Sequence, residues 1–189
     1  GMVKALNRNG WDTVSLNFRG CSGECNRQLK FYHSGETEDL ETVINYVIRK
    51  NLYSQLVLVG FSLGGNVVLK YLGEKGINRD RCIKAAVAIS VPCDLASGAL
   101  KLAQPANRIY MKRFLRLLRC KIKMKNRIMP DAINDYGFHQ IKNFEEYDNR
   151  YTAPIHGFRD AKDYWEKASS KPFLSHISVP TLLINAADD

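Results

Sequence analysis

The chain has 189 residues, a mass of 21.5 kDa and a formal net charge of +9, with 45% hydrophobic and 25% charged residues. That length fits one domain with a full core, and the composition is ordinary for a soluble globular protein. No apolar stretch approaches the roughly 20 residues needed to cross a bilayer. The first residues lack the charged-then-apolar layout of a signal peptide, so we expect a cytoplasmic rather than an exported protein.

The first half of the chain shows one strand pattern and two helix patterns. Val3 and Leu6 are typical of a short helix that ends at Asn9 and Gly10. Residues 13–18 alternate apolar and polar side chains, which predicts a half-buried strand. A helix with acidic residues in its first turn is then predicted by an apolar stripe at helical spacing: Leu40, Val43, Ile44, Val47 and Ile48.

Three continuous apolar runs have the character of central parallel strands. They are Leu56–Phe61, Ile83–Ile89 and Thr181–Ile184. Strands that alternate with helical patterns predict an α/β fold, with a mainly parallel sheet flanked by helices and joined by right-handed crossovers.

The long stretch between the last two runs breaks this rhythm. It is too long for a single crossover and carries helical patterns near residues 109–118 and Ala161–Ala168. We therefore predict three parts: a core over residues 1–95, an inserted helical cap over residues 96–175, and a core strand within residues 176–189.

The most specific short motif is Gly60-Phe61-Ser62-Leu63-Gly64, a G-x-S-x-G pattern between an apolar run and a helical run. In that context a serine sits on a tight strand-to-helix turn, and glycines two residues before and after it relieve crowding. Ser62 Oγ would project from the sheet edge, and the Leu63 amide would donate to an oxyanion. The alternative is a phosphate-binding turn, which the Gly65-Asn66-Val67 continuation disfavours because no Lys-Ser/Thr pair follows.

Together with the motif, four other segments resemble the YheT-like branch of the α/β-hydrolases, which includes the eukaryotic ABHD lipid and ester hydrolases. The segments are NFRGCSGE at 17–24, YHSGET at 32–37, GFSLGGN at 60–66, TAP and GF at 152–158, and VPTLLINAADD at 179–189. The resemblance spans nearly the whole chain and implies a partial α/β-hydrolase fold.

The resemblance also implies a chemistry. Ser62 matches the nucleophile, and Leu63 supplies an oxyanion amide. The acid is expected just after the strand ending at Ile184, at Asp189 with Asp188 as the alternative. These residues imply cleavage of carboxylic esters, in acyl lipids or short acyl esters, through an acyl-enzyme. No metal or organic cofactor is implied.

Asp94 is a second candidate acid, because some α/β-hydrolases place the acid after the strand equivalent to Ile83–Ile89. Its other interpretation is the N-cap of a helix beginning at Leu95, which we favour.

The family pattern also includes a histidine after the acid, which this chain does not contain. Among the histidines present, His33 is expected to order its loop, and the others to be surface or packing residues: His139, His156 and His176. The chain looks like the middle of a longer hydrolase. The alternative to an esterase is therefore a truncated, catalytically inactive protein that serves as a binding or membrane-associated module.

The family's sheet has a strand between the residue 13–18 strand and Leu56–Phe61, and that strand is not part of this sequence. Unpaired buried strand edges are costly and invite association. We therefore predict that these two strands pair directly in a rearranged sheet, or that a homodimer forms.

The positive charge is concentrated in one segment. Ten basic residues and no acidic one lie between Lys101 and Arg127. The part from Arg108 to Arg127 has the pattern of a basic amphipathic helix, which suits an anionic membrane surface. The alternative is a cap helix whose charges are only solvated. Nucleic-acid binding is disfavoured, because aromatic residues do not interleave with the charges.

The five cysteines are scattered, and their spacing argues against a zinc or C-x-x-C redox site. We expect free thiols in a reducing cytoplasm. They are Cys21, Cys25, Cys82, Cys93 and Cys120.

Overall fold

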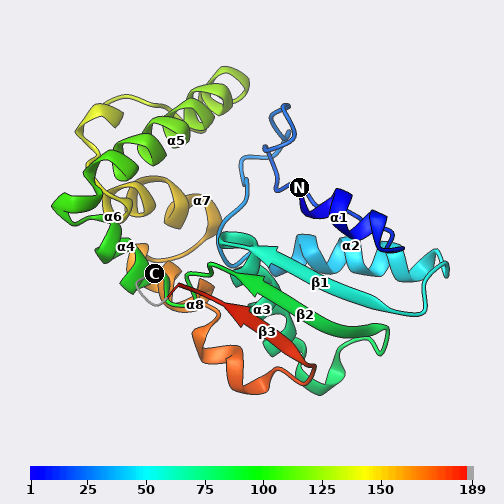
Figure 1. Ribbon diagram of the computed structural model, residues 1–189. Coiled ribbons are helices and arrows are strands. Elements are labelled where there is room, and N and C mark those ends of the chain that lie inside the picture. The colour runs from blue at the N-terminus through cyan, green and yellow to red at the C-terminus, as the bar shows by residue number, and fades with distance from the viewer. Residues whose placement is uncertain (187–189) are drawn as a thin grey trace.

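The computed structural model describes residues 1–186 and contains one parallel sheet of three strands. The strands are β1 (Leu56–Phe61), β2 (Ile83–Ile89) and β3 (Thr181–Ile184), in the order β1-β2-β3 (Figure 1). All three apolar runs are thus confirmed as strands with the expected bounds. In register, Phe61 lies opposite Ile89, and Ile89 lies opposite Ile184, so the three strands end level with one another.

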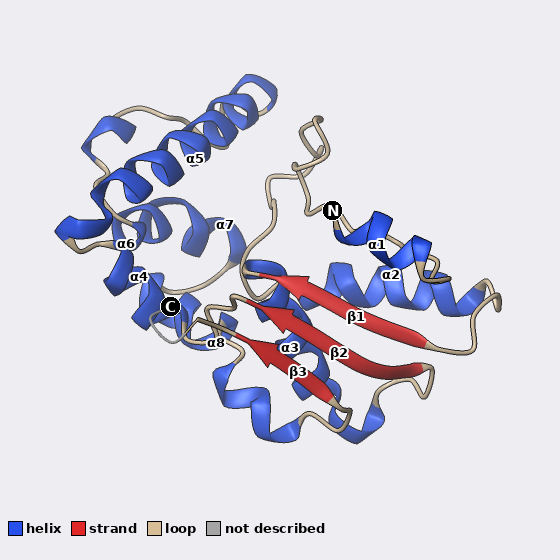
Figure 2. Cartoon of the chain, in the orientation of Figure 1, coloured by secondary structure: helices blue, strands red, loops and turns tan. Residues whose placement is uncertain are grey.

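The described part of the chain also contains eight α-helices, four short 3-10 helices and one π-helix (Figure 2). The helices are α1 (Met2–Arg8), α2 (Thr37–Arg49), α3 (Leu63–Lys75), α4 (Leu95–Leu102), α5 (Arg108–Ile128), α6 (Phe144–Tyr147), α7 (Ala153–His156) and α8 (Ala161–Ala168). The 3-10 helices are η1 (Gly76–Asn78), η2 (Pro105–Asn107), η3 (Phe138–Gln140) and η5 (Lys171–His176), and the π-helix is η4 (Asp148–Thr152). None of the described helices is both long and apolar enough to cross a membrane.

Helix α3 is the centre of the core. Residues 65–73 are all buried, because β1, β2, α2 and η5 pack around this helix. Helix α2 contributes Leu40 and Ile44 to the same cluster, as its apolar stripe predicts. At Gly73 an added Cβ would lie 2.3 Å from the carbonyl oxygen of Phe173, so glycine is what allows η5 to approach α3.

The described residues between β2 and β3 form no strand and build a largely helical region (Figure 1). Its main cluster is formed by apolar side chains of α5, the following turns and one residue of the early loop: Met111, Leu115, Ile122, Ile133, Phe138, Tyr147, Tyr151 and Phe31. Helix α5 is longer than the pattern at residues 109–118 indicates, and α8 has the expected bounds.

The prediction of a strand at residues 13–18 is wrong. These residues have no regular secondary structure, and Val14 remains 64% exposed. The alternating pattern supplies one apolar face, but no described strand lies beside the segment to complete a ladder. Phe18 instead stacks on Tyr32, with ring centroids 5.2 Å apart, and packs against the core cluster.

Direct pairing of residues 13–18 with β1 is therefore not observed. Among the described residues β1 pairs only with β2, so its other edge is without a ladder partner in this chain. The homodimer remains a prediction. Helix α1, by contrast, ends at Arg8 with Asn9 as its C-cap, as expected, and Gly10 follows with a φ of +79°.

Candidate functional site

Ser62 occupies a sharp turn between β1 and α3. Its φ of 49° and ψ of −123° lie in a region that residues with a side chain rarely adopt. The turn is fixed on both sides: the Ser62 amide donates to Ile89 O at 2.8 Å, and Ser62 O accepts from the Gly65 amide at 2.9 Å. The Ser62 residue is exposed although α3 behind it is buried, so its hydroxyl is presented at the sheet edge.

The turn depends on glycine at Gly60. An added Cβ there would lie 2.5 Å from Gly64 O and 2.6 Å from Gly65 Cα, both rigid backbone atoms. The second crowded position is Gly65, where a Cβ would lie 2.3 Å from Val91 Cγ2. The expectation that Gly64 is equally constrained is wrong, because a Cβ on Gly64 would meet no described atom within 4 Å.

The Leu63 amide lies in the first turn of α3, directly after Ser62. Amides in the first turn have no acceptor within their own helix, and the helix dipole makes this end partially positive. The arrangement thus places donors suited to developing negative charge beside the Ser62 hydroxyl.

The ends of β2 and β3 are joined next to this turn. The Ser90 amide donates to Ile184 O at 2.8 Å. The side chain of Asn185 then accepts from the Val91 amide and donates to Val91 O, both at 3.0 Å. These bonds fix the path of the chain up to Asn185. The candidate acids Asp188 and Asp189 lie outside the described residues.

Asp94 is the N-cap of α4, as the favoured interpretation predicts. Its Oδ1 accepts from the Ser97 amide at 3.1 Å, and its Oδ2 accepts from Lys171 Nζ at 3.0 Å. The Ser97 hydrogen bond, followed by the Lys171 contact, lowers the pKa of this carboxyl. Both oxygens are engaged in holding α4 and η5, which argues for a structural role.

Asn66 lies one turn into α3, is fully buried, and joins this helix to two other segments of the chain. Its Nδ2 donates to Ser34 O and to Ala168 O, both at 2.8 Å. Its Oδ1 accepts from the Ser170 amide at 2.9 Å. Sequence reasoning did not assign this role to Asn66. The available signal was a polar side chain directly before three apolar residues of the helical run, Val67, Val68 and Leu69.

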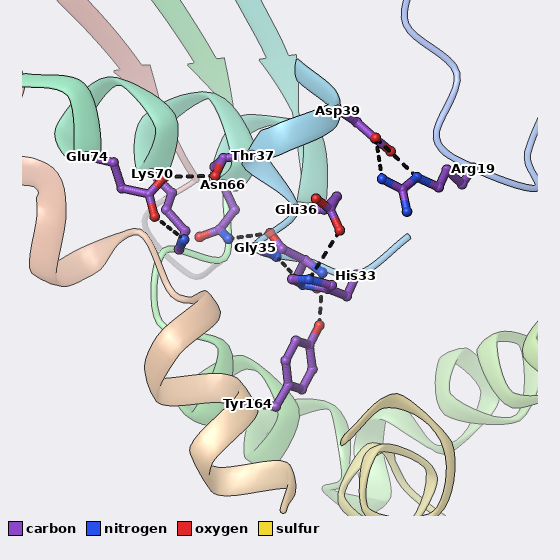
Figure 3. A network of polar contacts seen from close by, with 11 residues as sticks. Arg19, His33, Gly35, Glu36, Thr37, Asp39, Asn66, Lys70, Glu74 and Tyr164 are labelled. Carbon is purple, nitrogen blue, oxygen red and sulfur yellow. Dashed lines mark hydrogen bonds and ion pairs between the residues drawn. The ribbon is translucent and has the colours of Figure 1, made fainter. Parts of the chain in front are cut away.

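His33 and His156 are brought together, with ring centroids 4.7 Å apart. His33 Nδ1 accepts from the Gly35 amide at 3.1 Å, which confirms its expected role in ordering the loop. His33 Nε2 faces Glu36 Oε2 at 3.4 Å (Figure 3). His139 and His176 are exposed. Ligand atoms of three residues here lie within 4.8 Å of one another, in the only candidate metal-binding group within residues 1–186: His33, Glu36 and His156.

Both paired histidines are held in their neutral form. Burial, followed by the adjacent His156, lowers the pKa of His33 to about 3. Burial, with smaller effects of Lys30 and Arg19, lowers the pKa of His156 to about 4. The two rings contact Gly35, Glu36 and neighbouring aromatic side chains.

The sequence matches known proteins along its whole length. The model of one family, described as the alpha/beta hydrolase fold, matches residues 1–189. "Putative esterase YheT" of Escherichia coli (strain K12) is 37% identical over 191 residues, which cover 100% of this chain and 56% of the relative. No solved structure matches the chain significantly.

Two further relatives carry lipase names. "Phospholipase ABHD3" of Mus musculus is 29% identical over 189 residues, covering 100% of this chain and 46% of the relative. "Monoacylglycerol lipase" of Saccharomyces cerevisiae is 28% identical over 188 residues, covering 95% of this chain and 41% of the relative. The chain thus spans about half the length of these curated relatives.

Proposed function

Because this chain belongs to the alpha/beta hydrolase fold family, we propose that it carries the nucleophile of a carboxylic ester hydrolase. Ser62 is the proposed nucleophile. The observation that carries this assignment is the backbone of Ser62, whose positive φ presents an exposed hydroxyl at the N-terminus of the buried helix α3. Such a nucleophile elbow is the arrangement by which α/β-hydrolases present a serine for acyl transfer.

In the proposed mechanism, Ser62 Oγ attacks the ester carbonyl carbon and its proton passes to a histidine that this sequence does not contain. The carbonyl oxygen becomes an oxyanion, to which the Leu63 amide donates a hydrogen bond. The alcohol leaves after taking the proton back from the histidine, and water then hydrolyses the acyl-enzyme by the same route. Asp189, or Asp188, orients the histidine.

The names of the relatives support an acyl lipid or a short acyl ester as substrate. In this proposal residues 1–95 and 176–189 form the catalytic core, and residues 96–175 form a cap over it. The helical character of the described residues between β2 and β3 supports that division. The cap would then set which acyl chains reach Ser62.

The test is intact mass spectrometry of the full-length protein before and after treatment with a fluorophosphonate. One covalent adduct is expected on the wild type and none on Ser62→Ala. Ser90→Ala is the matched control, because Ser90 also has a positive φ at the end of a strand. An adduct that persists in Ser62→Ala would contradict the assignment. No adduct on the folded wild type would favour the inactive binding module.

A second proposal concerns a lipid surface, and helix α5 carries it. The helix buries Met111 and Leu115, but Ile109 remains 81% exposed and Tyr110 61% exposed. Exposed basic side chains lie among these apolar ones: Arg108, Lys112, Arg113 and Arg116. A surface that combines exposed apolar and basic side chains suits an anionic membrane, because the apolar side chains can insert into lipid while the basic ones bind anionic headgroups.

The segregation of charge on α5 is less complete than the sequence pattern indicates. Phe114 is 43% exposed, whereas Met111 on the same helix is buried. Arg119 forms an ion pair with Asp135 at 3.5 Å, so it is drawn toward the protein. The exposed apolar residues therefore favour membrane binding by α5 over the alternative of a cap helix whose charges are only solvated.

Co-sedimentation with vesicles tests this proposal. The full-length protein should bind vesicles with anionic lipid, and salt or neutral lipid should weaken that binding. Lys112→Glu together with Arg116→Glu should abolish it, whereas Arg49→Glu on the exposed end of α2 should not. Equal retention on neutral and anionic vesicles would contradict the proposal.

A further inference from the structure

Cys21 and Lys121 lie in contact although 100 residues separate them in the sequence. The Lys121 Nζ atom donates to the Cys21 Sγ atom at 2.7 Å. We propose that this pair is an oxidation site, at which a peroxide joins the cysteine sulfur to the lysine nitrogen through a covalent S–N bond. The proposal is independent of the esterase assignment, because it uses none of the proposed catalytic residues.

The two side chains belong to separate elements that the fold fixes against each other. Lys121 lies on α5, and Cys21 lies in the loop before α2. One turn further along α5, the buried Lys125 donates to Asn26 O, Asn26 Oδ1 and Gln28 O at 2.7, 2.8 and 2.6 Å. These bonds attach the loop to α5 without involving Cys21. Two groups held in contact in this way react far faster than the same groups free in solution.

A tight turn and an aromatic ring position the two reacting atoms. The Cys21 amide donates to Phe18 O at 2.9 Å, and Gly20 has a φ of +70°, which glycine adopts without strain. Phe18 stacks on Tyr32, and the Lys121 Nζ atom lies 4.4 Å from the centroid of the Tyr32 ring. The same ring therefore contacts the turn that carries the sulfur and attracts the ammonium that lies beside it.

Solvent reaches both members of the pair. Cys21 is exposed and Lys121 is half-buried, and Lys121 also lines a small cavity with Arg19 and Cys25. Within residues 1–186 the contacts of the Lys121 ammonium are with the Cys21 sulfur and the Tyr32 ring rather than with a carboxylate. A small oxidant can thus enter, and no ion pair has to break before the nitrogen bonds to sulfur.

The first step oxidises the sulfur. The Cys21 thiol releases its proton to water, and the thiolate attacks one oxygen of hydrogen peroxide. The O–O bond breaks, and the leaving hydroxide takes a proton from the Lys121 ammonium to become water. The products are a sulfenic acid at Cys21, a neutral amine at Lys121 and one water molecule.

The second step forms the bridge. The Lys121 nitrogen attacks the Cys21 sulfur, the S–N bond forms, and the S–O bond of the sulfenic acid breaks. The departing hydroxide takes a proton from the attacking nitrogen and leaves as a second water molecule. The product is a sulfenamide. Sulfur has lost two electrons, and the peroxide has gained them.

The bridge is reversible and changes how the chain is connected. Two molecules of a thiol reductant return the cysteine and the lysine and are themselves oxidised to a disulfide. While the bridge is present, it fastens the loop before α2 to α5. In the chain-entropy model, a cross-link between residues far apart in sequence stabilises the folded state by restricting the unfolded chain. The bridged protein should therefore unfold at a higher temperature than the reduced one.

The test is mass spectrometry of the full-length protein, first reduced and then treated with hydrogen peroxide. The bridged product should be lighter than the reduced protein by two hydrogen atoms, and it should have lost one of the five free thiols. A disulfide has the same mass but consumes two thiols. Proteolysis should release one cross-linked pair of peptides, which contains Cys21 and Lys121 and which a thiol reductant separates.

The informative variant is Lys121→Arg, which keeps a positive charge beside the sulfur and removes the amine. Peroxide should still oxidise Cys21 in this variant, to a sulfenic acid that dimedone traps, but the cross-linked peptides should be absent. Lys123→Arg, at an exposed position of the same helix, is the matched control and should keep the cross-link. Cys25→Ser removes the other thiol of the loop and should keep it too.

Thermal unfolding supplies the second readout. Peroxide should raise the unfolding temperature of the wild type and of Lys123→Arg, and a thiol reductant should reverse this rise. Lys121→Arg should show no rise. A disulfide between Cys21 and another cysteine in place of the S–N bond would overturn the proposal. A wild type that yields no cross-linked peptides after peroxide treatment would overturn it as well.

Discussion

The side-chain oxygen of Asn66 accepts a hydrogen bond from the backbone amide of Ser170 at 2.9 Å. This bond joins the helix that follows Ser62 to the chain just after α8. With its two further bonds to Ser34 O and Ala168 O, Asn66 satisfies two buried backbone groups and one part-buried group from two distant segments. One side chain therefore connects the helix that follows Ser62 to the loop at Ser34 and to the segment from Ala168 to Ser170.

Asn66→Ala should be strongly destabilising. It leaves two carbonyls and one amide without partners in a buried place, and each such group costs about 1–3 kcal/mol. We expect the free energy of unfolding to fall by about 3 kcal/mol or more, measured by urea denaturation of the full-length protein. Asn45→Ala, on the exposed face of α2, is the control and should change little. Similar losses in both variants would refute the coupling role.

The two outer glycines of the Ser62 motif should respond differently to alanine. Gly60→Ala places a Cβ against backbone atoms at 2.5–2.6 Å, which cannot move without reshaping the turn. We expect a loss of about 1–3 kcal/mol and loss of fluorophosphonate labelling. Gly64→Ala meets open space and should keep both stability and labelling. If Gly64→Ala proved as damaging as Gly60→Ala, the described turn would be incorrect.

Ser62→Gly should stabilise the protein while removing the proposed nucleophile. A residue with a side chain held at a φ of 49° and ψ of −123° stores about 1–3 kcal/mol, and glycine relieves much of it. Ser62→Ala is the matched variant, since it loses the hydroxyl but keeps the Cβ. Thermal unfolding should rank Ser62→Gly above Ser62→Ala. The reverse ranking would show that the backbone at this turn is not strained.

The sheet could be predicted closely because its signals are local. Buried parallel strands are continuous apolar runs, and β1, β2 and β3 each have one. The Ser62 turn could be predicted for the same reason, because its strand, the glycines on either side of Ser62 and its helix are consecutive in the sequence. The error at residues 13–18 arose because alternation describes one strand's face and carries no information on whether a partner strand is present.

The features that escaped prediction depend on pairs far apart in sequence. His33 and His156 are unremarkable singly, and only folding brings their rings to 4.7 Å. Lys125 belongs to the basic segment, yet it is 1% exposed and its Nζ donates to Asn26 O and Gln28 O at 2.7 and 2.6 Å. Charge patterning along one helix cannot identify which cation the rest of the chain will bury.

Asp148 should make the free energy of unfolding depend on pH, and comparison with Asp148→Asn should isolate this dependence. Burial raises the pKa of its carboxyl to about 6, although Thr152 Oγ1 and Trp165 Nε1 donate to it at 2.6 and 2.8 Å. An acid whose pKa is higher in the folded state stabilises that state at low pH, and this contribution is lost as pH rises through about 6. The wild type therefore loses this contribution between about pH 4 and pH 7, whereas Asp148→Asn has none to lose.

We expect the unfolding free energy of Asp148→Asn minus that of the wild type to increase by about 2–3 kcal/mol between pH 4 and pH 8, because the wild type loses stability over this range and the variant does not. His33 and His156 change charge at the acidic end of this range, but they are present in both proteins and cancel in the difference. Urea unfolding followed by tryptophan fluorescence measures it, because Trp165 contacts the carboxylate. Asp131→Asn, which removes a charge at an exposed position, should show a much smaller pH-dependent difference. A difference for Asp148→Asn that stays constant across this range would mean that Asp148 is ionised in the folded protein throughout.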